Sequence, residues 1–248
     1  SNGEGIEFLN LNNSEIRKGF SEKLRQYFVT EEFVKDSEYA KVIAWRNKTV
    51  ATMNSIIRKT IYGDEAERAK ILTGEKLIAN NPVIEDKNII LNTNDEFTVE
   101  RYTIKTESPR FIISDHPDAE PMEVELKYYE TEVSYLNDDD DLIKVWIKIL
   151  HEDSQAEFQK VANLLKIRAI QKKGKDKSWL WYYNFLRRYA DVNYAYSITA
   201  HKSQGSTYNT TFVLEDDIDV NSDIVERNRI KYTAYTRSSK KLYVLKRF

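Results

Sequence analysis

The stretch Ile198-Thr199-Ala200-His201-Lys202-Ser203-Gln204-Gly205-Ser206 packs hydroxyl, imidazole, ammonium and amide donors next to a glycine. The apolar run before it, residues 194–199, predicts a strand, and open α/β sheets bind ligands at the carboxyl ends of their strands. Glycine lets a ligand approach the backbone closely. The stretch therefore suits a loop that contacts phosphate oxygens, with an ordinary polar surface loop as the alternative.

The segments on both sides of this stretch alternate between strand and helix patterns. Downstream, we expect strands over residues 212–214 and 242–245, with a helix over 222–237 between them. Near the start of the chain, we expect a strand over residues 41–45, between helices over 16–28 and 49–61. Both ends of the chain therefore predict one α/β domain.

The middle of the chain changes character from about residue 74. Short strand-like runs are separated by turn residues such as 92–95; the runs are residues 77–79, 89–91, 97–99, 122–128 and 142–150. Helices expected from residue 153 or 154 to about 172, and over 178–190, then restore the α/β pattern. We therefore assign residues 1–73 and 151–248 to the α/β domain and residues 74–150 to a small inserted antiparallel β module. Its acidic run, 138–141, is interpreted as a solvated loop rather than a metal site.

The composition of the 248 residues limits the classes of function that the chain can have. With 41% apolar and 31% charged residues the chain is expected to fold as a soluble protein, and its net charge of −2 means that any DNA contact must be local. The 16 Tyr and 4 Trp residues could stack on bases, although aromatic side chains in folded domains usually belong to the core. The absence of cysteine excludes disulfides and thiolate metal sites and is compatible with the cytoplasm.

Targeting signals are not evident in the sequence. The longest apolar runs, such as residues 142–150, are interrupted by Lys144 and Lys148 and are too short to span a bilayer. The start has no charged region followed by an apolar one, so we expect no signal peptide. Ser1-Asn2, in place of an initial Met, is interpreted as a remnant of tag removal, which would make the chain an expressed fragment.

A second stretch, Tyr232-Thr233-Ala234-Tyr235-Thr236-Arg237, lies late in a predicted helix and just before the last predicted strand. An arginine at the end of a helix can simply interact with the last carbonyls. It can also present a planar cation to the γ-phosphate of a nucleotide, as an arginine finger does. Position alone leaves both readings open.

The two stretches together resemble motifs V and VI of superfamily 1 helicases, in particular of the Dda-like and RecD-like branch. The resemblance is close over residues 194–245, and Val42-Ile43-Ala44-Trp45-Arg46-Asn47-Lys48 with Asn54 resembles motif IVa more loosely. The β insert lies where this branch carries an SH3-like module. The resemblance implies a second RecA-like domain of the P-loop-NTPase type, without its own P-loop and interrupted by an SH3-like insert. That insert either guides DNA or only stabilises the fold.

The resemblance also implies a role for each matching residue. Positions that touch the backbone of single-stranded DNA are matched by Thr199 and His201, with Lys202 and Ser203 as helpers. Positions that face the γ-phosphate of ATP are matched by Gln204 and Gly205, and the arginine finger by Arg237. Arg46 and Asn47 could contact DNA, or could form only the structural end of a strand. Backbone contacts of this kind carry little sequence information, so we expect sequence-independent binding.

The sequence lacks two features that ATP hydrolysis requires. No segment reads G-x-x-x-x-G-K-S/T, and no acidic pair after an apolar strand convincingly provides a Walker B site. The resemblance implies that both belong to a first RecA-like domain preceding residue 1, which binds most of the ATP and Mg²⁺. We therefore expect the chain alone to be inactive, and the whole protein to be an ATP-dependent 5′→3′ DNA helicase. Its partners would be single-stranded DNA and that N-terminal domain, with no membrane.

Two other classes of function stay open. The chain could be a non-enzymatic single-stranded DNA-binding module that has the DNA face without the motor. It could also be a hydrolase that uses His116, His151 or His201, although no G-x-S-x-G or H-E-x-x-H pattern supports this and scattered histidines are more often structural.

Overall fold

The structure is a computed structural model that describes residues 4–10, 12–85, 88–111, 120–137, 139, 141–173 and 176–246, except for the side chains of residues 16–18. His116 and parts of the acidic run 138–141 lie outside the described residues. The chain divides into two compact units. Unit 1 contains residues 1–69 and 194–248, and unit 2 contains residues 70–193.

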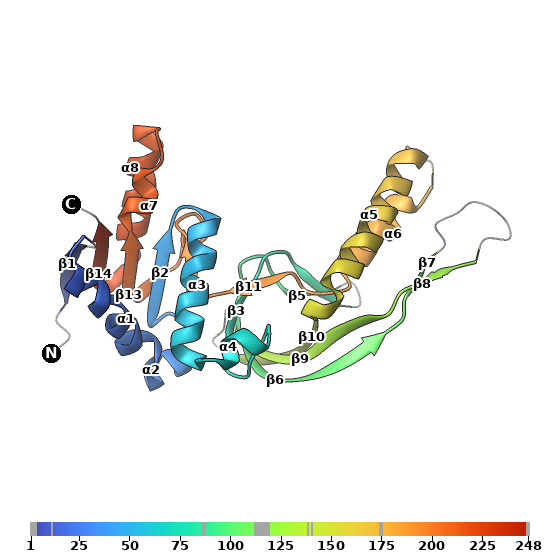
Figure 1. The fold of residues 1–248 in the computed structure, drawn as a ribbon, viewed down its shortest axis with the longest axis horizontal. Helices are drawn as coiled ribbons and strands as arrows, with labels where there is room; N and C mark the ends of the chain where they lie inside the picture. The colour runs from blue at the N-terminus through green and yellow to red at the C-terminus, as the bar shows by residue number, and fades with distance from the viewer. Residues whose placement is uncertain are drawn as a thin grey trace. The chain divides into compact units, whose positions relative to one another are not determined.

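Unit 1 contains a five-stranded sheet in which every neighbouring pair of strands is parallel. In spatial order its strands are β1 (Gly5–Asn10), β14 (Ser238–Lys246), β13 (Tyr208–Leu214), β2 (Ala40–Ala44) and β12 (Ser197–Thr199). Figure 1 shows β1, β14, β13 and β2 side by side in that order. The predicted α/β class is therefore confirmed.

Helices cover both faces of this sheet, because alternate side chains of a strand point to opposite faces. The helices are α1 (Ser14–Phe28), α2 (Glu31–Lys35), α3 (Asn47–Tyr62), α4 (Glu65–Arg68), α7 (Glu215–Asp219) and α8 (Ile224–Tyr235). Val42 and Phe212 pack in one core cluster with Leu24 of α1 and Ile57 of α3. On the neighbouring strand positions Ile43, Val213 and Val244 are also buried, and α7 and α8 contact β2, β13 and β14.

Strand β1 has no counterpart among the predicted elements. It pairs only with β14, at the edge of the sheet, and of its large apolar side chains Ile6 and Phe8 are 65% and 60% exposed. Only Leu9 is buried in the core. The sequence of β1 therefore lacks the continuous run of apolar residues by which the inner strands are recognised.

Unit 2 is built on a second five-stranded sheet with antiparallel pairs. In spatial order its strands are β10 (Leu142–Leu150), β9 (Leu126–Leu136), β6 (Glu96–Glu107), β3 (Lys76–Ala79) and β11 (Val192–Tyr194). Two short hairpins add β4 (Val83–Glu85) with β5 (Asn88–Leu91), and β7 (Arg110–Phe111) with β8 (Met122–Glu123). β10 pairs with β9, β9 with β6, and β6 with β3, each antiparallel. The antiparallel pairing agrees with the expected β module, and its SH3-like character stays a prediction.

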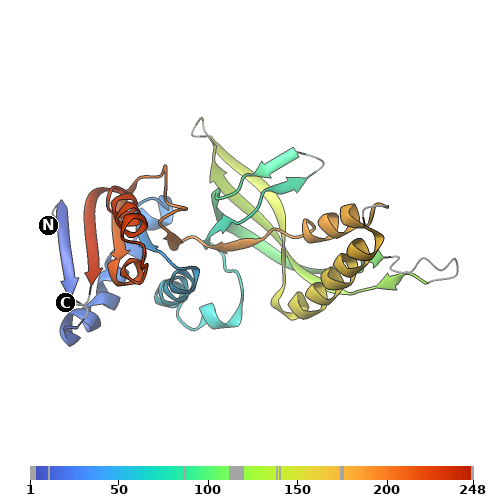
Figure 2. The same cartoon turned by 90° about the horizontal axis from the view of Figure 1, so that it is seen from above.

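Unit 2 also contains two helices that the sequence pattern places with the α/β domain. After a short 3₁₀ turn, η1 (Glu152–Ser154), come α5 (Gln155–Lys172) and α6 (Ser178–Leu186), which lie side by side (Figure 2). Val161 and Leu165 of α5 and Phe185 of α6 share a core cluster with Leu126 and Leu150 of the β module. The second unit therefore extends from residue 70 to 193, beyond the expected 74–150, because these helices bury their apolar faces on its sheet.

Candidate nucleotide and nucleic-acid site

Strand β12, which leads into the stretch 199–206, is held at the edge of the unit 1 sheet from both sides. On one side, the backbone N–H of Ala200 donates to the carbonyl of Ala44 at 2.8 Å. On the open side, the buried side chain of Asn54 on α3 donates to the carbonyls of Tyr194 and Ser197, each at 3.0 Å. Its Oδ1 accepts the N–H of Ser197 at 2.7 Å. Asn54 thus forms the hydrogen bonds that a neighbouring strand would otherwise form with this edge of β12.

Residues 199–206, here called the motif V loop, fold back on themselves through local hydrogen bonds. The hydroxyl of Thr199 accepts the N–H of Lys202 at 3.3 Å, and its carbonyl accepts the N–H of Ser203 at 3.0 Å. Ser203 is fully buried and its hydroxyl donates to the carbonyl of Ala200 at 2.8 Å. Thr199 and Ser203 therefore hold the loop together, and a DNA contact by Ser203 would require the loop to rearrange.

The loop turns at Gly205, whose φ of +94° lies in the region that glycine adopts readily. No atom lies within 4 Å of the position that a Cβ would occupy there. The backbone conformation, and not a lack of space, therefore requires glycine at this position.

Arg237 lies against the far end of this loop. Its Nη1 donates to the carbonyl of Ser206 at 3.1 Å, its Nε to the carbonyl of Thr233 at 3.0 Å, and its Nη2 to the hydroxyl of Thr236 at 2.9 Å. All three acceptors are neutral, and within the described ranges no carboxylate forms an ion pair with Arg237. The guanidinium, which is partly exposed, therefore keeps an uncompensated positive charge.

The motif V loop joins the two ends of the sheet. Thr199 lies at the carboxyl end of β12, beside Ala44 of β2, so Arg46 and Asn47 follow the neighbouring strand at the same end. Ser206 lies before the amino end of β13, where the N–H of Tyr208 donates to the carbonyl of Arg237 at 2.8 Å. Thr199, a predicted DNA contact, and Ser206, which bonds the predicted arginine finger, thus lie at opposite ends of one short loop.

His201 and Gln204, the two exposed side chains of this loop, face a hollow of about 820 Å³. The opposite wall is formed by α8, including the side chains of Arg229, Tyr232 and Thr233. Tyr232 is 72% exposed. The hollow therefore offers an imidazole, an amide, a guanidinium and an aromatic ring on one open surface of unit 1.

The predicted DNA contact Arg46 has a partner that the sequence pattern did not indicate. Its Nε lies 2.6 Å from Oδ1 of Asp217, whose carboxylate also accepts the N–H groups of Trp45 and Arg46 and the hydroxyl of Thr49. Burial raises the pKa of Asp217, but the hydrogen bonds from Thr49 and Arg46 outweigh it, so the net shift of its pKa is downward. Asp217 caps the start of α3 from another segment, while the side chains of Arg46 and Asn47 stay exposed.

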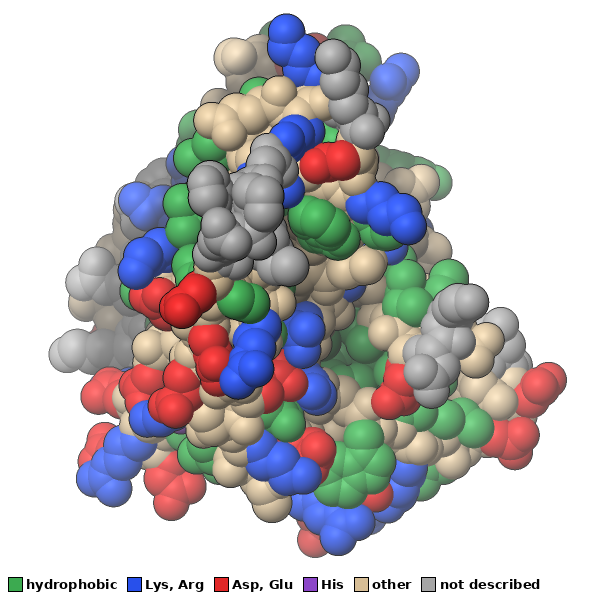
Figure 3. Space-filling view, turned by 90° about the vertical axis from the view of Figure 1, so that its right-hand side faces the viewer, with side chains coloured by type: hydrophobic (Ala, Val, Ile, Leu, Met, Phe, Trp, Pro, Cys, Tyr) green, Lys and Arg blue, Asp and Glu red, His purple; other side chains and the backbone are tan. Residues whose placement is uncertain are grey.

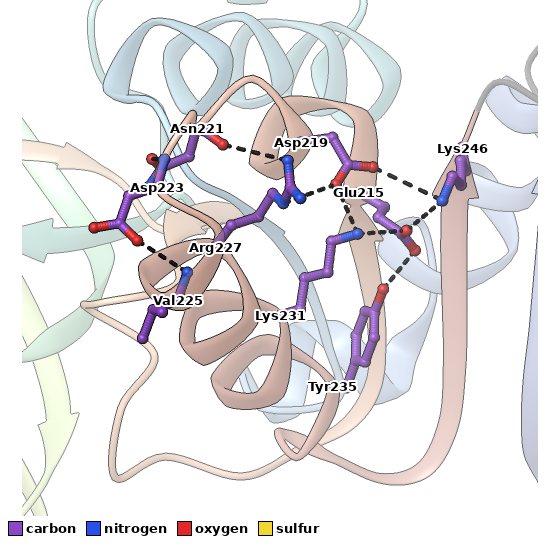
Figure 4. Close-up of polar contacts among 9 residues, drawn as sticks. All are labelled: Glu215, Asp219, Asn221, Asp223, Val225, Arg227, Lys231, Tyr235 and Lys246. Atoms are coloured by element: carbon purple, nitrogen blue, oxygen red, sulfur yellow. Dashed lines mark hydrogen bonds and ion pairs between the residues drawn. The ribbon is translucent and has the colours of Figure 1, made fainter.

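A buried carboxylate holds α8, which carries Arg237 at its end, to the sheet. Glu215 accepts hydrogen bonds from Lys231 of α8 and Lys246 of β14, each at 2.7 Å, and from the hydroxyl of Tyr235 (Figure 4). Lys231 also lies 2.7 Å from Asp219. Burial raises the pKa of Glu215, but these donors outweigh it and lower the pKa to about 2. In the sequence, the acidic run 215–219 indicates that carboxylates gather here. It does not indicate that Lys231 and Lys246 bind them.

Two further properties concern cofactors and membranes. The ranges given above contain no cluster of three His, Asp or Glu side chains that could hold a metal ion. Within the same ranges, no helix is long and apolar enough to cross a membrane.

Comparison with known proteins finds a family model that matches the C-terminal segment. Residues 194–245 match the UvrD-like helicase C-terminal domain. The matched segment contains both the motif V loop and the stretch 232–237, and the match confirms the expected likeness of this segment to a helicase C-terminal region.

More distant relatives align with most of the chain. An uncharacterized protein of Acanthamoeba polyphaga mimivirus is 25% identical over 244 residues, covering 84% of this chain and 48% of that protein. The Pif1 helicase from Candida albicans is similar with a TM-score of 0.46 and 13% identity, covering 94% of this chain and 49% of that one. The Pif1 helicase from Bacteroides, solved with ADP-AlF3 and ssDNA, has a TM-score of 0.36 and 12% identity, covering 91% and 48%. The chain thus spans about half the length of each of these relatives.

Proposed function

We propose that this chain is the second motor region of an ATP-dependent DNA helicase that moves 5′→3′ along single-stranded DNA. In this proposal it closes a nucleotide cleft whose other side is an N-terminal RecA-like domain. The match of residues 194–245 to the UvrD-like helicase C-terminal domain supports the class of protein. The polarity and the individual roles rest on the resemblance of the motif V and motif VI residues.

The observation that carries the nucleotide contact is the setting of Arg237. Its guanidinium has no carboxylate partner among the described residues and lies beside Ser206, next to Gly205 and Gln204 in the same loop. A planar cation, an amide and a glycine backbone fit the oxygens of a γ-phosphate. ATP, with Mg²⁺ held mainly by the other domain, would supply the phosphoryl group. Arg237 would stabilise the charge that develops on it, and Gln204 would contact it from the same side.

The DNA contact is proposed at the other end of the loop. Thr199, His201 and Lys202 follow β12, with Arg46 and Asn47 following β2 beside it. The hydroxyl of Ser203 is buried, and hydrogen bonds within residues 199–206 connect the two ends of the loop. In this proposal the loop therefore moves as a rigid unit. A displacement of Ser206 by the nucleotide would therefore move His201 and Lys202 along the DNA backbone.

The test measures ATP hydrolysis, with and without oligo-dT, by the product of the full open reading frame that encodes this chain and by residues 1–248 alone. We expect DNA-stimulated hydrolysis only in the full-length product, and a loss of about a thousandfold or more in kcat in its Arg237→Ala variant. Arg227→Ala is the matched control, because Arg227 lies on α8, the helix that precedes Arg237, but pairs with Asp219 at 3.8 Å. Hydrolysis by Arg237→Ala at the rate of the control would overturn the finger assignment.

The same experiment separates the helicase from the alternative. If the full-length product binds oligo-dT but hydrolyses no ATP under any condition, the non-enzymatic single-stranded DNA-binding module replaces the helicase. If it neither binds nor hydrolyses, the site assignment in the motif V loop is wrong.

A further inference from the structure

The hairpin formed by α5 and α6 in unit 2 concentrates positive charge that the whole chain, with a net charge of −2, does not have. Among the described residues of 155–188, eight Lys or Arg side chains oppose only Glu157 and Asp176. Lys173, Lys177 and Arg187 form no ion pair with any residue in the described ranges. Figure 3 shows Lys and Arg side chains outnumbering acidic ones over the upper part of this face, whereas the lower part mixes both signs.

Two cations flank an exposed ring of α6. Trp181 and Asn184 lie on α6, Lys177 directly precedes its first residue, and Arg188 lies two residues beyond its last residue, Leu186. These four residues, called the stripe below, recur at spacings of four, three and four, which is the spacing of neighbours on one side of a helix. Trp181 is 39% exposed, although its ring could bury a large apolar area.

A pocket of about 330 Å³ opens on this stripe. Trp181 and Asn184 line it from α6, Arg188 lines it from the turn after that helix, and Arg110 and Phe111 line it from β7. Each arginine keeps one acidic partner, since Arg110 lies 2.9 Å from Glu123 and Arg188 lies 3.1 Å from Glu107. The volume is at the lower end for small-molecule sites and suits one flat ring held between aromatic side chains.

We propose that the stripe Lys177, Trp181, Asn184 and Arg188 binds single-stranded nucleic acid, with one base in the pocket against Trp181. The backbone would follow Lys177 and Arg188. The exposed ammonium of Lys177, which forms no ion pair with any described residue, and the exposed guanidinium of Arg188 fit phosphates, and an exposed ring between them fits an unstacked base, which a duplex would not offer. This second contact belongs to unit 2, whereas the motif V loop belongs to unit 1. It rests on the proposed function only for the preference for DNA over RNA.

The experiment measures the binding of fluorescein-labelled oligo-dT to residues 1–248 by fluorescence anisotropy, over a range of salt concentrations. We expect Trp181→Ala to weaken binding about fivefold or more, and Trp181→Phe, which keeps a ring, to retain most of the affinity. Lys177→Ala removes one phosphate contact, so the slope of log affinity against log salt should fall by about 0.7. Trp146→Ala is the matched control, because Trp146 is 42% exposed in the same unit and also lies against an arginine, Arg101.

Unfolding transitions of all variants establish that they are folded, and the Phe variant keeps the test valid if Trp181→Ala does not fold. Affinities of Trp181→Ala and Lys177→Ala equal to that of Trp146→Ala would overturn the second contact. In that case a loss of affinity in His201→Ala would leave the proposed function in place. If His201→Ala also binds like the control, both proposals fail. Weakening by Trp181→Ala with an unchanged His201→Ala would support the contact in unit 2 and contradict the one in unit 1.

Discussion

Nη1 of Arg237 donates a hydrogen bond to the carbonyl of Ser206 at 3.1 Å, and this bond ties the end of α8 to the motif V loop. Nε and Nη2 of the same side chain bond Thr233 and Thr236, so the plane of the guanidinium is fixed by three acceptors. A lysine at this position would keep the charge but could not reproduce this fork. A substitution by lysine therefore tests whether position 237 requires a guanidinium or only a positive charge.

We predict that Arg237→Lys lowers kcat for DNA-stimulated ATP hydrolysis nearly as much as Arg237→Ala, by about a thousandfold. Steady-state hydrolysis by the full-length product measures the effect, and anisotropy with oligo-dT should show unchanged DNA affinity. Arg227→Lys, on the helix that precedes Arg237, is the control. Substantial activity in Arg237→Lys would mean that charge alone is required there.

Asn54 offers a test of how the motif V loop is positioned. Its side chain satisfies the N–H and carbonyl of Ser197 and the carbonyl of Tyr194 on the open edge of β12. Asn54→Ala leaves these buried groups without a partner, so we predict a loss of about 3 kcal/mol in the free energy of unfolding. Urea denaturation measures it, with the exposed neighbour Ser55→Ala as the control.

Hydrogen exchange adds a local readout for the same variant. The amide of Ser197 should exchange faster in Asn54→Ala than in Ser55→Ala, since it loses its acceptor. Unchanged protection of that amide would show that β12 does not depend on Asn54.

Most of the fold of unit 1 could be predicted because its elements have clear apolar periods. Helix α3 and strands β2 and β14 lie within a few residues of their predicted positions. The extent of the inserted unit could not be predicted in the same way. The apolar period of α5 predicts a buried face, confirmed at Val161, Leu165 and Ala169, but a period does not say which sheet a helix packs on.

The candidate site could be predicted only as far as its motifs. The structure brings Gly205, Ser206 and Arg237 together, although 31 residues separate Ser206 from Arg237 along the chain. It also gives Arg46 an acidic partner, Asp217, that lies 171 residues away, and sequence spacing contains no information on such a pairing. The roles of the site residues in binding DNA and ATP stay predictions.

Asp217 is predicted to contribute more to stability than its position in a short acidic run suggests. It caps α3 through the N–H groups of Trp45 and Arg46 and pairs with the guanidinium of Arg46. Asp217→Ala should lower the free energy of unfolding by about 2 to 3 kcal/mol, and Asp217→Asn by less because an amide oxygen can still accept. Thermal or urea unfolding measures both.

The control for this cap is Asp64→Ala, because Asp64 directly precedes α4 but its side chain makes no cap hydrogen bond. Its substitution should change stability by less than about 0.5 kcal/mol. Equal effects of Asp217→Ala and Asp64→Ala would contradict the tertiary cap.

The cluster around Glu215 predicts a specific dependence of stability on pH. The pKa of Glu215 is about 2 in the folded chain, below the ordinary value of 4.5 that it takes when unfolded. Because the folded pKa is lower, the stabilisation is fully present above about pH 4.5 and is lost as the pH falls towards 2. A shift of this size corresponds to roughly 3 kcal/mol at most.

We predict that Glu215→Gln lowers the free energy of unfolding at pH 7 by about 3 kcal/mol, because it removes the carboxylate that Lys231 and Lys246 share. The difference in stability between wild type and Glu215→Gln should then shrink steadily from pH 5 to pH 2, as Glu215 takes up its proton in the wild type. Urea denaturation at a series of pH values measures this difference, and subtraction removes the contribution of other carboxylates such as Asp217. The exposed Glu65→Gln is the control, and its difference from wild type should stay small. A difference for Glu215→Gln that does not change between pH 5 and pH 2 would show that its carboxylate is not held ionised by Lys231, Lys246 and Tyr235.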